Sequence, residues 1–155
     1  MVHLDGDDWL AHPNVLALLN KVYHDPQVWM TYGQFEIYPT KKRGNCKQVP
    51  TGVIKNNSFR EYRWKTSHLR THYARLFKSI KREDLMYQNT FCPKSGDLAL
   101  MFPMLEMAGF HAKFIPDILY IYNRATVLND DKLNHELQVK IEQYIRAKPK
   151  YQPLT

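Results

Sequence analysis

The stretch SGDLALMFPMLEMAGFHAKFIPDILYIYNRAT, residues 95–126, decides the fold class of this chain. Its first half predicts a helix over residues 97–109, because Asp97 is a favoured opening residue and Gly109 stands where glycine commonly ends a helix. Pro103 lies inside this helix and is expected to kink it or to set a tight first turn. The second half of the stretch predicts strands.

Strands are predicted on both sides of that helix. Residues 112–115 and 118–122 are short apolar runs, which predict two strands hinged at the Pro-Asp pair between them. VWMTYGQFEI, residues 28–37, is rich in β-branched and aromatic residues and predicts another strand. Because strands and helices mix along the chain, the class is α/β or α+β. The remaining predicted elements are helices over residues 12–23, 67–80 and 130–147 and a long loop over residues 38–58.

The composition indicates one soluble globular domain. The chain has 155 residues, 44% hydrophobic and 24% charged, which excludes general disorder. No apolar run approaches the roughly 20 residues that a transmembrane segment needs, and the acidic start is unlike a secretory signal. The 2 cysteines are too few for a disulfide scaffold. We therefore expect a cytoplasmic protein with no transmembrane segment.

Basic residues are concentrated in one part of the sequence. The formal net charge is +7, and residues 41–82 contain 13 Lys or Arg against a single acid, Glu61. Such a patch attracts phosphate groups of nucleic acid, nucleotides or glycans. One functional hypothesis is therefore a non-catalytic basic module that binds nucleic acid or another polyanion through residues 41–82. A solvated loop followed by a basic helix face is an equally weighted alternative.

An acidic cluster lies near the N-terminus. Asp5, Asp7 and Asp8 occur within four residues, and Gly6 lets the backbone turn so that Asp5 and Asp7 can face one point. Their repulsion is relieved by a cation, and carboxylate oxygens suit Mg²⁺ or Mn²⁺. From the spacing alone, the favoured alternative is an acidic helix N-terminus in which Asp7 or Asp8 is the cap.

Two further groups of residues have both a functional and a structural interpretation. His68 and His72 are four residues apart on the predicted helix and could hold a metal ion, although a surface pair is the favoured interpretation. The run FREYRWK, residues 59–65, alternates aromatic and cationic side chains. It could stack on a base or sugar, or it could anchor Tyr62 and Trp64 in the core.

Two of these segments together resemble the family 2 glycosyltransferases, which have the GT-A fold. DGDDWL, residues 5–10, followed by a helix, resembles the metal-binding DxD segment of that family, and residues 95–126 look like its second signature. The resemblance covers most of residues 2–126. It implies an α/β, partial GT-A-like fold with a mixed sheet and flanking helices. Residues 1–126 would form the catalytic segment, and residues 127–155 a C-terminal amphipathic helix and tail.

The resemblance implies a metal-dependent donor site. Asp5 and Asp7 correspond to residues that meet the nucleotide sugar and a divalent ion, Mn²⁺ or Mg²⁺, and Asp8 is a second candidate metal ligand. Tyr122 and Arg124, with Asp5, would bind the donor near its diphosphate. Alanine and threonine stand at 125–126, where relatives often carry a metal-binding histidine, so no third ligand is implied. The expected donor is a UDP- or GDP-linked sugar.

The resemblance also implies an acceptor side. Asp97 is placed like the acid that deprotonates the acceptor hydroxyl, although Gly96 stands where many relatives have a glutamate. The helix dipole predicts that Asp97 is ionised and acts through its position rather than through a raised pKa; the alternative is an ordinary helix cap. The acceptor would be a glycan, lipid or protein, and the transfer would invert the anomeric centre. The candidate acceptor-side residues are Arg60, Arg63, Trp64, His68 and Arg70.

In the GT-A fold, the half that holds the donor nucleotide precedes the DxD segment. Only four residues precede Asp5 in this sequence. The resemblance therefore predicts the acceptor-side half of an enzyme, truncated at its N-terminus and possessing little activity by itself. An upstream segment or a second chain would supply the missing half. The further alternative is a folded but inactive remnant.

Overall fold

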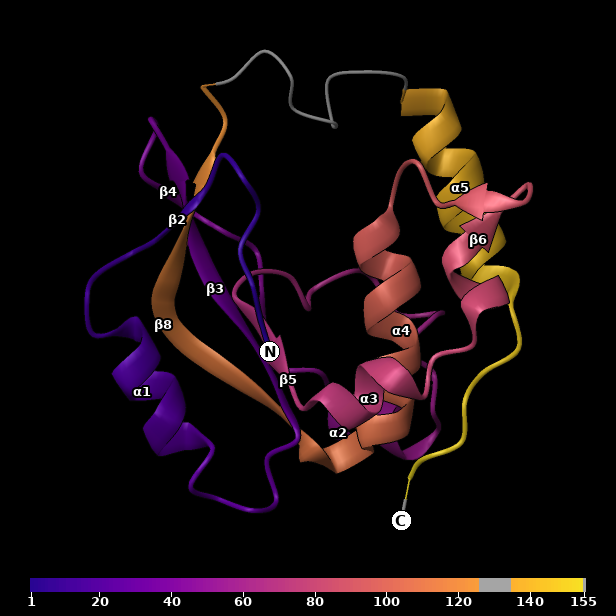
Figure 1. Ribbon diagram of the computed structural model, residues 1–155, viewed down its shortest axis with the longest axis horizontal. Coiled ribbons are helices and arrows are strands. Elements are labelled where there is room, and N and C mark those ends of the chain that lie inside the picture. The colour runs from indigo at the N-terminus through magenta and orange to yellow at the C-terminus, as the bar shows by residue number, and fades with distance from the viewer. Residues whose placement is uncertain (126–134, 155) are drawn as a thin grey trace.

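The computed structural model describes residues 1–125 and 135–154 as a mixed α/β protein with a curled mixed sheet and flanking helices (Figure 1). The main sheet has the strand order β1-β5-β3-β8-β2, with β4 paired to β3. A small second sheet pairs β6 with β7. The strands are β1 (Val2–His3), β2 (Trp9–Leu10), β3 (Met30–Tyr38), β4 (Lys42–Arg43), β5 (Arg70–His72), β6 (Met86–Tyr87), β7 (Thr90–Phe91) and β8 (Ala112–Asn123).

Helices cover both faces of the main sheet. Figure 1 shows α1 on the outer side of β8, and α4 between the sheet and α5. Two groups of buried side chains follow this layering, one beneath α1 and a larger one around α4 that α5 also joins. In the part of the chain that the structure describes, no helix is both long and apolar enough to cross a membrane. The helices are α1 (Val15–Val22), α2 (Thr51–Lys55), α3 (Ala74–Lys78), α4 (Gly96–Ala108) and α5 (His135–Ala147), with 3₁₀ turns η1 (Arg82–Leu85) and η2 (Gly109–His111).

The parallel pair β3 and β8 forms the centre of the sheet. Its register runs from Met30 opposite Ala112 to Tyr38 opposite Asn123. The sequence predicted two strands hinged at positions 116–117; the structure has one continuous strand with an irregular register there, since Gly33 pairs with Ile115 and Gln34 with Ile118. A bulge keeps the strand in the sheet while bending it, so the Pro-Asp pair bends the strand without ending it.

The predicted helix over residues 97–109 is confirmed as α4, one residue earlier at each end. It ends at Gly109, whose φ of 53° is in the region that glycine tolerates best. Its side chains are buried on nearly all sides, as expected for a helix that is apolar all round. This helix is consequently a core element, and only its first turn is available for chemistry.

The predicted helix over residues 67–80 is wrong. Residues 70–72 form strand β5, which pairs with β1 on one side and β3 on the other, and only the short α3 is helical in this range. Apolar residues in this range, such as Leu69, Tyr73 and Leu76, have helical spacing, but pairing with two strands determines the local conformation. His68 and His72 are therefore not on one helix face. The loop predicted at residues 38–58 also contains β4 and α2.

The other predicted elements are found with shifted ends. The helix predicted over residues 12–23 is confirmed as α1, and the strand over residues 28–37 as β3. The helix predicted over residues 130–147 corresponds to α5 from His135 onward. Its predicted start at residues 130–134 lies outside the described residues. The boundary at residues 126–127 between the two segments inferred from the family resemblance lies there too.

Candidate active site

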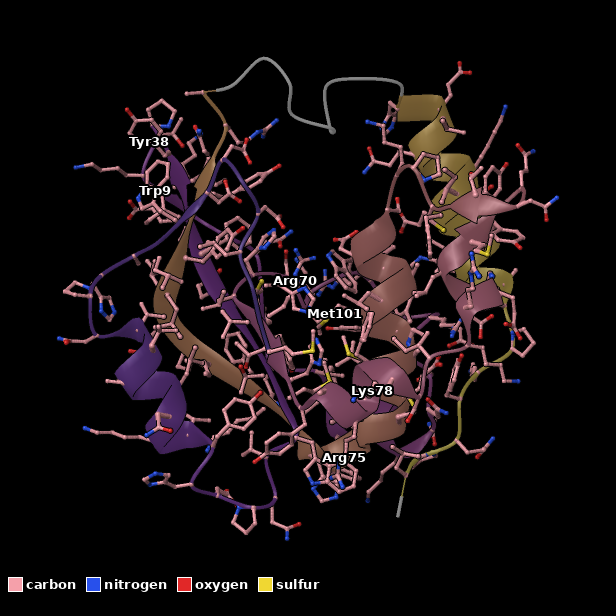
Figure 2. All side chains as sticks on the ribbon, in the orientation of Figure 1. Trp9, Tyr38, Arg70, Arg75, Lys78 and Met101 are labelled. Atoms are coloured by element: carbon pink, nitrogen blue, oxygen red, sulfur yellow. The ribbon has the colours of Figure 1, made fainter. Side chains whose placement is uncertain are left out.

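A cavity of about 490 Å³ opens where the sheet meets the first turn of α4. Its wall combines residues from the N-terminal segment, β5, β8, the start of α4 and α5. Figure 2 shows Arg70 in the space between the sheet and α4. We call this cavity the sheet–α4 pocket. Its lining residues are His3, Asp5, His68, Arg70, Lys94, Ser95, Gly96, Asp97, Leu100, Tyr122 and Gln138.

Arg70 joins two carboxylates that are far apart in the sequence. Its Nη2 atom lies 3.5 Å from Asp5 Oδ2, and its Nη1 atom lies 3.5 Å from Asp97 Oδ2. The side chain of Arg70 is only 6% exposed, against 52% for Asp5 and 33% for Asp97. Strand β5 positions this arginine, because Arg70 pairs with His3 in β1. The site is therefore built around one buried guanidinium group.

Asp97 is recessed in the pocket at the start of α4. Its Oδ1 atom accepts a hydrogen bond of 2.9 Å from the backbone N–H of Leu98. Burial raises the pKa of Asp97 above its ordinary value, while Arg70 and the Leu98 N–H act in the opposite direction. The expectation that the helix dipole leaves this pKa unraised is therefore wrong, because desolvation outweighs the dipole and the arginine. A raised pKa suits a group that accepts a proton near neutral pH.

The three acidic residues of the N-terminal cluster have different surroundings. Both carboxylate oxygens of Asp8 are hydrogen-bonded, Oδ2 to the Tyr120 hydroxyl at 2.5 Å and Oδ1 to the backbone N–H of Asn123 at 2.7 Å. Asp8 thus fastens the acidic segment to β8. Asp7 is exposed and lies outside the lining of the sheet–α4 pocket, and its carbonyl accepts a hydrogen bond from the Asn123 side chain. Only Asp5 of the three faces the pocket.

Aromatic rings line the sheet side of the pocket. His68 stacks on Tyr120 with ring centroids 4.4 Å apart and on Tyr122 at 5.6 Å, while Phe35 meets it edge-on at 5.7 Å. Burial, together with the smaller effect of the nearby Arg70 charge, lowers the pKa of His68 to about 2. His68 is therefore a neutral group in a largely apolar stack.

The neutral state of His68 predicts acid destabilisation. The unfolded chain takes up a proton at the ordinary histidine pKa of about 6.5, whereas folded His68 does not. Folding stability should therefore decrease as pH falls from about 6.5 towards 4, on the order of 1 kcal/mol per pH unit from this residue. Urea unfolding across this range measures the slope. His68→Gln should flatten it, and the exposed His24→Gln serves as the matched control. An unchanged slope in His68→Gln would contradict the assignment.

Several predicted site residues lie elsewhere. Arg60 is 3% exposed and pairs with Glu106 in the core. Trp64 packs edge-on against Phe102 at 5.5 Å. Neither of these residues lines the sheet–α4 pocket. Arg63 is exposed and also lies outside the pocket lining. Arg124 is outside it too, and its backbone N–H donates to the Tyr38 carbonyl at the end of the sheet. The predicted residues that the pocket does bring together are Asp5, His68, Arg70, Asp97 and Tyr122.

Sequence reasoning missed part of the pocket. Lys94 and Ser95 immediately precede α4, and their position beside Asp97 was a signal that could have been used. His3 is adjacent to Arg70 only through the pairing of β1 with β5. Gln138 belongs to the C-terminal helix, in which the sequence predicted no site residue. Its position in the pocket follows from how α5 docks.

Basic residues of segment 41–82 lie in several parts of the structure. Lys42 and Arg43 lie in β4 at one end of the sheet, whereas Arg75 and Lys78 lie at the opposite end of the molecule (Figures 1 and 2). Other members of the group are buried, as described for Arg60 and Arg70. Polyanion binding through residues 41–82 stays a prediction.

Comparison with known proteins identifies no relative. No family model, no curated protein and no solved structure matches this chain. Within residues 1–125 and 135–154, no group of three or more His, Cys, Asp and Glu side chains has a metal-binding arrangement.

Proposed function

We propose that this chain is a metal-dependent glycosyltransferase segment of the family 2, GT-A type that transfers a sugar from a nucleotide diphosphate to an acceptor hydroxyl. The observation that carries the proposal is the convergence of Asp5 and Asp97 on Arg70 within one pocket. The family resemblance assigned donor and metal contacts to Asp5 and the base to Asp97. Those roles require the two carboxylates to share one site.

In the proposed reaction, Asp97 is the general base. The acceptor oxygen forms a bond to the anomeric carbon of the donor sugar as the bond from that carbon to the diphosphate oxygen breaks. The bonding electron pair leaves with the diphosphate, and the hydroxyl proton passes to Asp97. The raised pKa of Asp97 favours this proton transfer. Attack from the side opposite the leaving group inverts the anomeric centre.

In this proposal, a divalent cation would be held by only part of the predicted ligand set. Mg²⁺ and Mn²⁺ are commonly held by one or two carboxylates together with substrate phosphates and water. Asp5 and Asp7 could provide those carboxylates, whereas the hydrogen bonds to both oxygens of Asp8 make it an anchor for the segment. The cation would offset the charge of the leaving diphosphate. To hold such a cation, Asp5 would have to release its contact with Arg70.

The substrates follow from the same assignment. The donor is a UDP- or GDP-linked sugar, with Tyr122 in the pocket wall beside it, and the acceptor is a hydroxyl of a glycan, lipid or protein. An upstream segment or a second chain contributes the nucleotide-binding half. This proposal is preferred to a polyanion-binding module because the basic residues of 41–82 are dispersed.

Calorimetric titration with UDP and GDP, in the presence and absence of Mn²⁺, tests the donor site. We expect weak nucleotide binding, because most nucleotide contacts are proposed to come from an upstream segment or a second chain. This binding should require Mn²⁺ and should be weakened further, at least about tenfold, by Asp5→Asn, since loss of a metal-site carboxylate lowers metal affinity. Asp117→Asn changes an exposed carboxylate outside the pocket wall and should bind like the parent protein. Nucleotide binding that neither requires Mn²⁺ nor is weakened by Asp5→Asn would contradict the proposal.

A further inference from the structure

Exposed hydrophobic side chains gather around the short strand β1 and the helix α3. Strand β1 is an edge strand, since it stands at one end of the sheet order and pairs with β5. Single exposed hydrophobic residues are ordinary, whereas a group of them on one surface commonly marks an interaction site. The group consists of Met1, Val2, Leu4, Tyr73 and Phe77, with exposed fractions from 38% for Phe77 to 58% for Met1.

On one face of β5, His72 connects the start of the chain with α3. Its backbone N–H donates to the Met1 carbonyl at 3.1 Å. Its ring stacks on Phe77, with ring centroids 6.3 Å apart. Helix α3 therefore borders the edge strand on this face, and Phe77 is partly open to solvent there.

On the opposite face of β5, Thr71 makes a corresponding connection. It lies opposite Val2 in the strand pair, and its hydroxyl contacts the Tyr23 hydroxyl at 2.7 Å. The Tyr23 ring meets Tyr73 edge-on, with ring centroids 5.3 Å apart. Successive residues of a strand point to opposite faces, so the contacts of Thr71 and His72 lie on the two sides of the sheet. The exposed hydrophobic side chains therefore surround one sheet edge.

Positive charge accompanies the hydrophobic side chains. Residues 73–82 contain four Lys or Arg and no acidic residue. Arg75 and Lys78 are exposed on α3 (Figure 2), and the guanidinium of Arg75 is held 4.1 Å from the centroid of the Trp29 ring. Such cations attract anionic surfaces, and the formal net charge of +7 adds to this attraction.

We propose that this sheet edge binds the headgroup region of an anionic lipid bilayer through a surface, here called the edge surface, that consists of Val2, Leu4, Tyr73, Arg75, Phe77 and Lys78. Aromatic and aliphatic side chains are stabilised at a membrane interface, and basic side chains are attracted to its anionic lipids. Single-stranded nucleic acid also binds aromatic and cationic side chains, but the aliphatic Val2 and Leu4 offer it no stacking surface. No residue of the edge surface lines the sheet–α4 pocket, so this proposal is independent of the proposed function.

Co-sedimentation of the full chain with lipid vesicles tests the cationic part of the edge surface. We expect binding to vesicles of phosphatidylcholine mixed with phosphatidylglycerol, little binding to phosphatidylcholine alone, and weaker binding as NaCl is raised. Lys78→Gln should weaken binding about fivefold, the usual effect of one cation near an anionic membrane. Lys42→Gln is the matched control, because it removes an exposed cation at the opposite end of the molecule, and it should bind like the parent protein (Figure 1).

The same assay tests the hydrophobic part. Leu4→Ser and Phe77→Ser should each weaken vesicle binding about three- to tenfold, since a hydrophobic side chain no longer enters the interface. Phe91→Ser makes the same change at an exposed position of β7 and should leave binding unchanged. Circular dichroism establishes that each variant is folded, and Leu4→Ser carries the test if Phe77→Ser is not.

Four results would overturn the proposal: no vesicle binding, binding that does not depend on phosphatidylglycerol, equal losses in Lys78→Gln and Lys42→Gln, or binding unaffected by both Lys78→Gln and Leu4→Ser. A single-stranded oligonucleotide provides the remaining comparison. If it displaces the protein from vesicles and its own binding requires Lys78, the edge surface is a nucleic-acid site and the proposal is wrong.

Discussion

Replacing Glu106 by glutamine is expected to lower the free energy of unfolding by about 3–5 kcal/mol, because it leaves the buried guanidinium of Arg60 without its counter-ion. Glu106 is 0% exposed. Its Oε1 lies 2.5 Å from Arg60 Nε, and its Oε2 lies 2.9 Å from Arg60 Nη2 and accepts the Tyr151 N–H at 3.0 Å. Urea unfolding followed by circular dichroism measures the loss.

Two control variants distinguish this buried pair from an ordinary salt bridge. Glu142→Gln removes the partially exposed i, i+4 partner of Arg146 and should cost only about 0.3–0.5 kcal/mol. The double variant Arg60→Met/Glu106→Leu should recover much of the loss, since apolar residues of similar volume can replace a buried ion pair. A single Glu106→Gln change as mild as Glu142→Gln would show that the pair does not organise this part of the core.

Asp97→Asn is expected to reduce kcat for sugar transfer by about 10²- to 10⁴-fold, the usual range for loss of a general base. The amide keeps the shape of the side chain and can still accept the Leu98 N–H, so the first turn of α4 should remain intact. Since the lost interaction is with the reacting proton, KM should change little. The assay is release of nucleoside diphosphate from UDP- and GDP-linked sugars, with the upstream segment or partner chain present if activity requires it.

Asp117→Asn is the matched control, because it makes the same chemical change on an exposed residue outside the pocket. It should retain the parental kcat. The acid limb of the parental kcat profile should lie above the ordinary aspartate range, since burial raises the pKa of Asp97 and only its ionised form accepts a proton. Transfer activity that survives Asp97→Asn would remove the assigned base and would favour an ordinary capping role for this residue.

Local signals predicted the elements that local interactions stabilise. The continuous apolar run before Gly109 and the glycine itself predicted α4, and its φ of 53° agrees with the expected helix end. The helix prediction for residues 70–72 was wrong for the opposite reason. They pair with Val2 and His3 in β1 and with Met30 and Thr31 in β3, which lie in parts of the chain that periodicity does not connect to them.

The site residues also divide into those that the sequence pointed to and those that only the fold explains. Asp5 and Asp97 were singled out from their residue types and surrounding motifs, and the pocket contains both. The arginine that joins them was one of several basic candidates, while Arg60, from the same group, pairs with Glu106 in the core. Spacing cannot separate these two arginines, because their roles depend on which carboxylate the folded chain brings near each.

The sequence by itself determined the mixed α/β class, the α4 helix and the identity of the two carboxylates beside Arg70. The class and the helix follow from side-chain pattern and residue chemistry within short windows, whereas the two carboxylates were named through the family resemblance. Only the tertiary structure decided that β5 is a strand, that Asp8 is an anchor and that Gln138 belongs to the pocket. The physical reason is that strand pairing, desolvation and helix docking depend on neighbours distant in sequence.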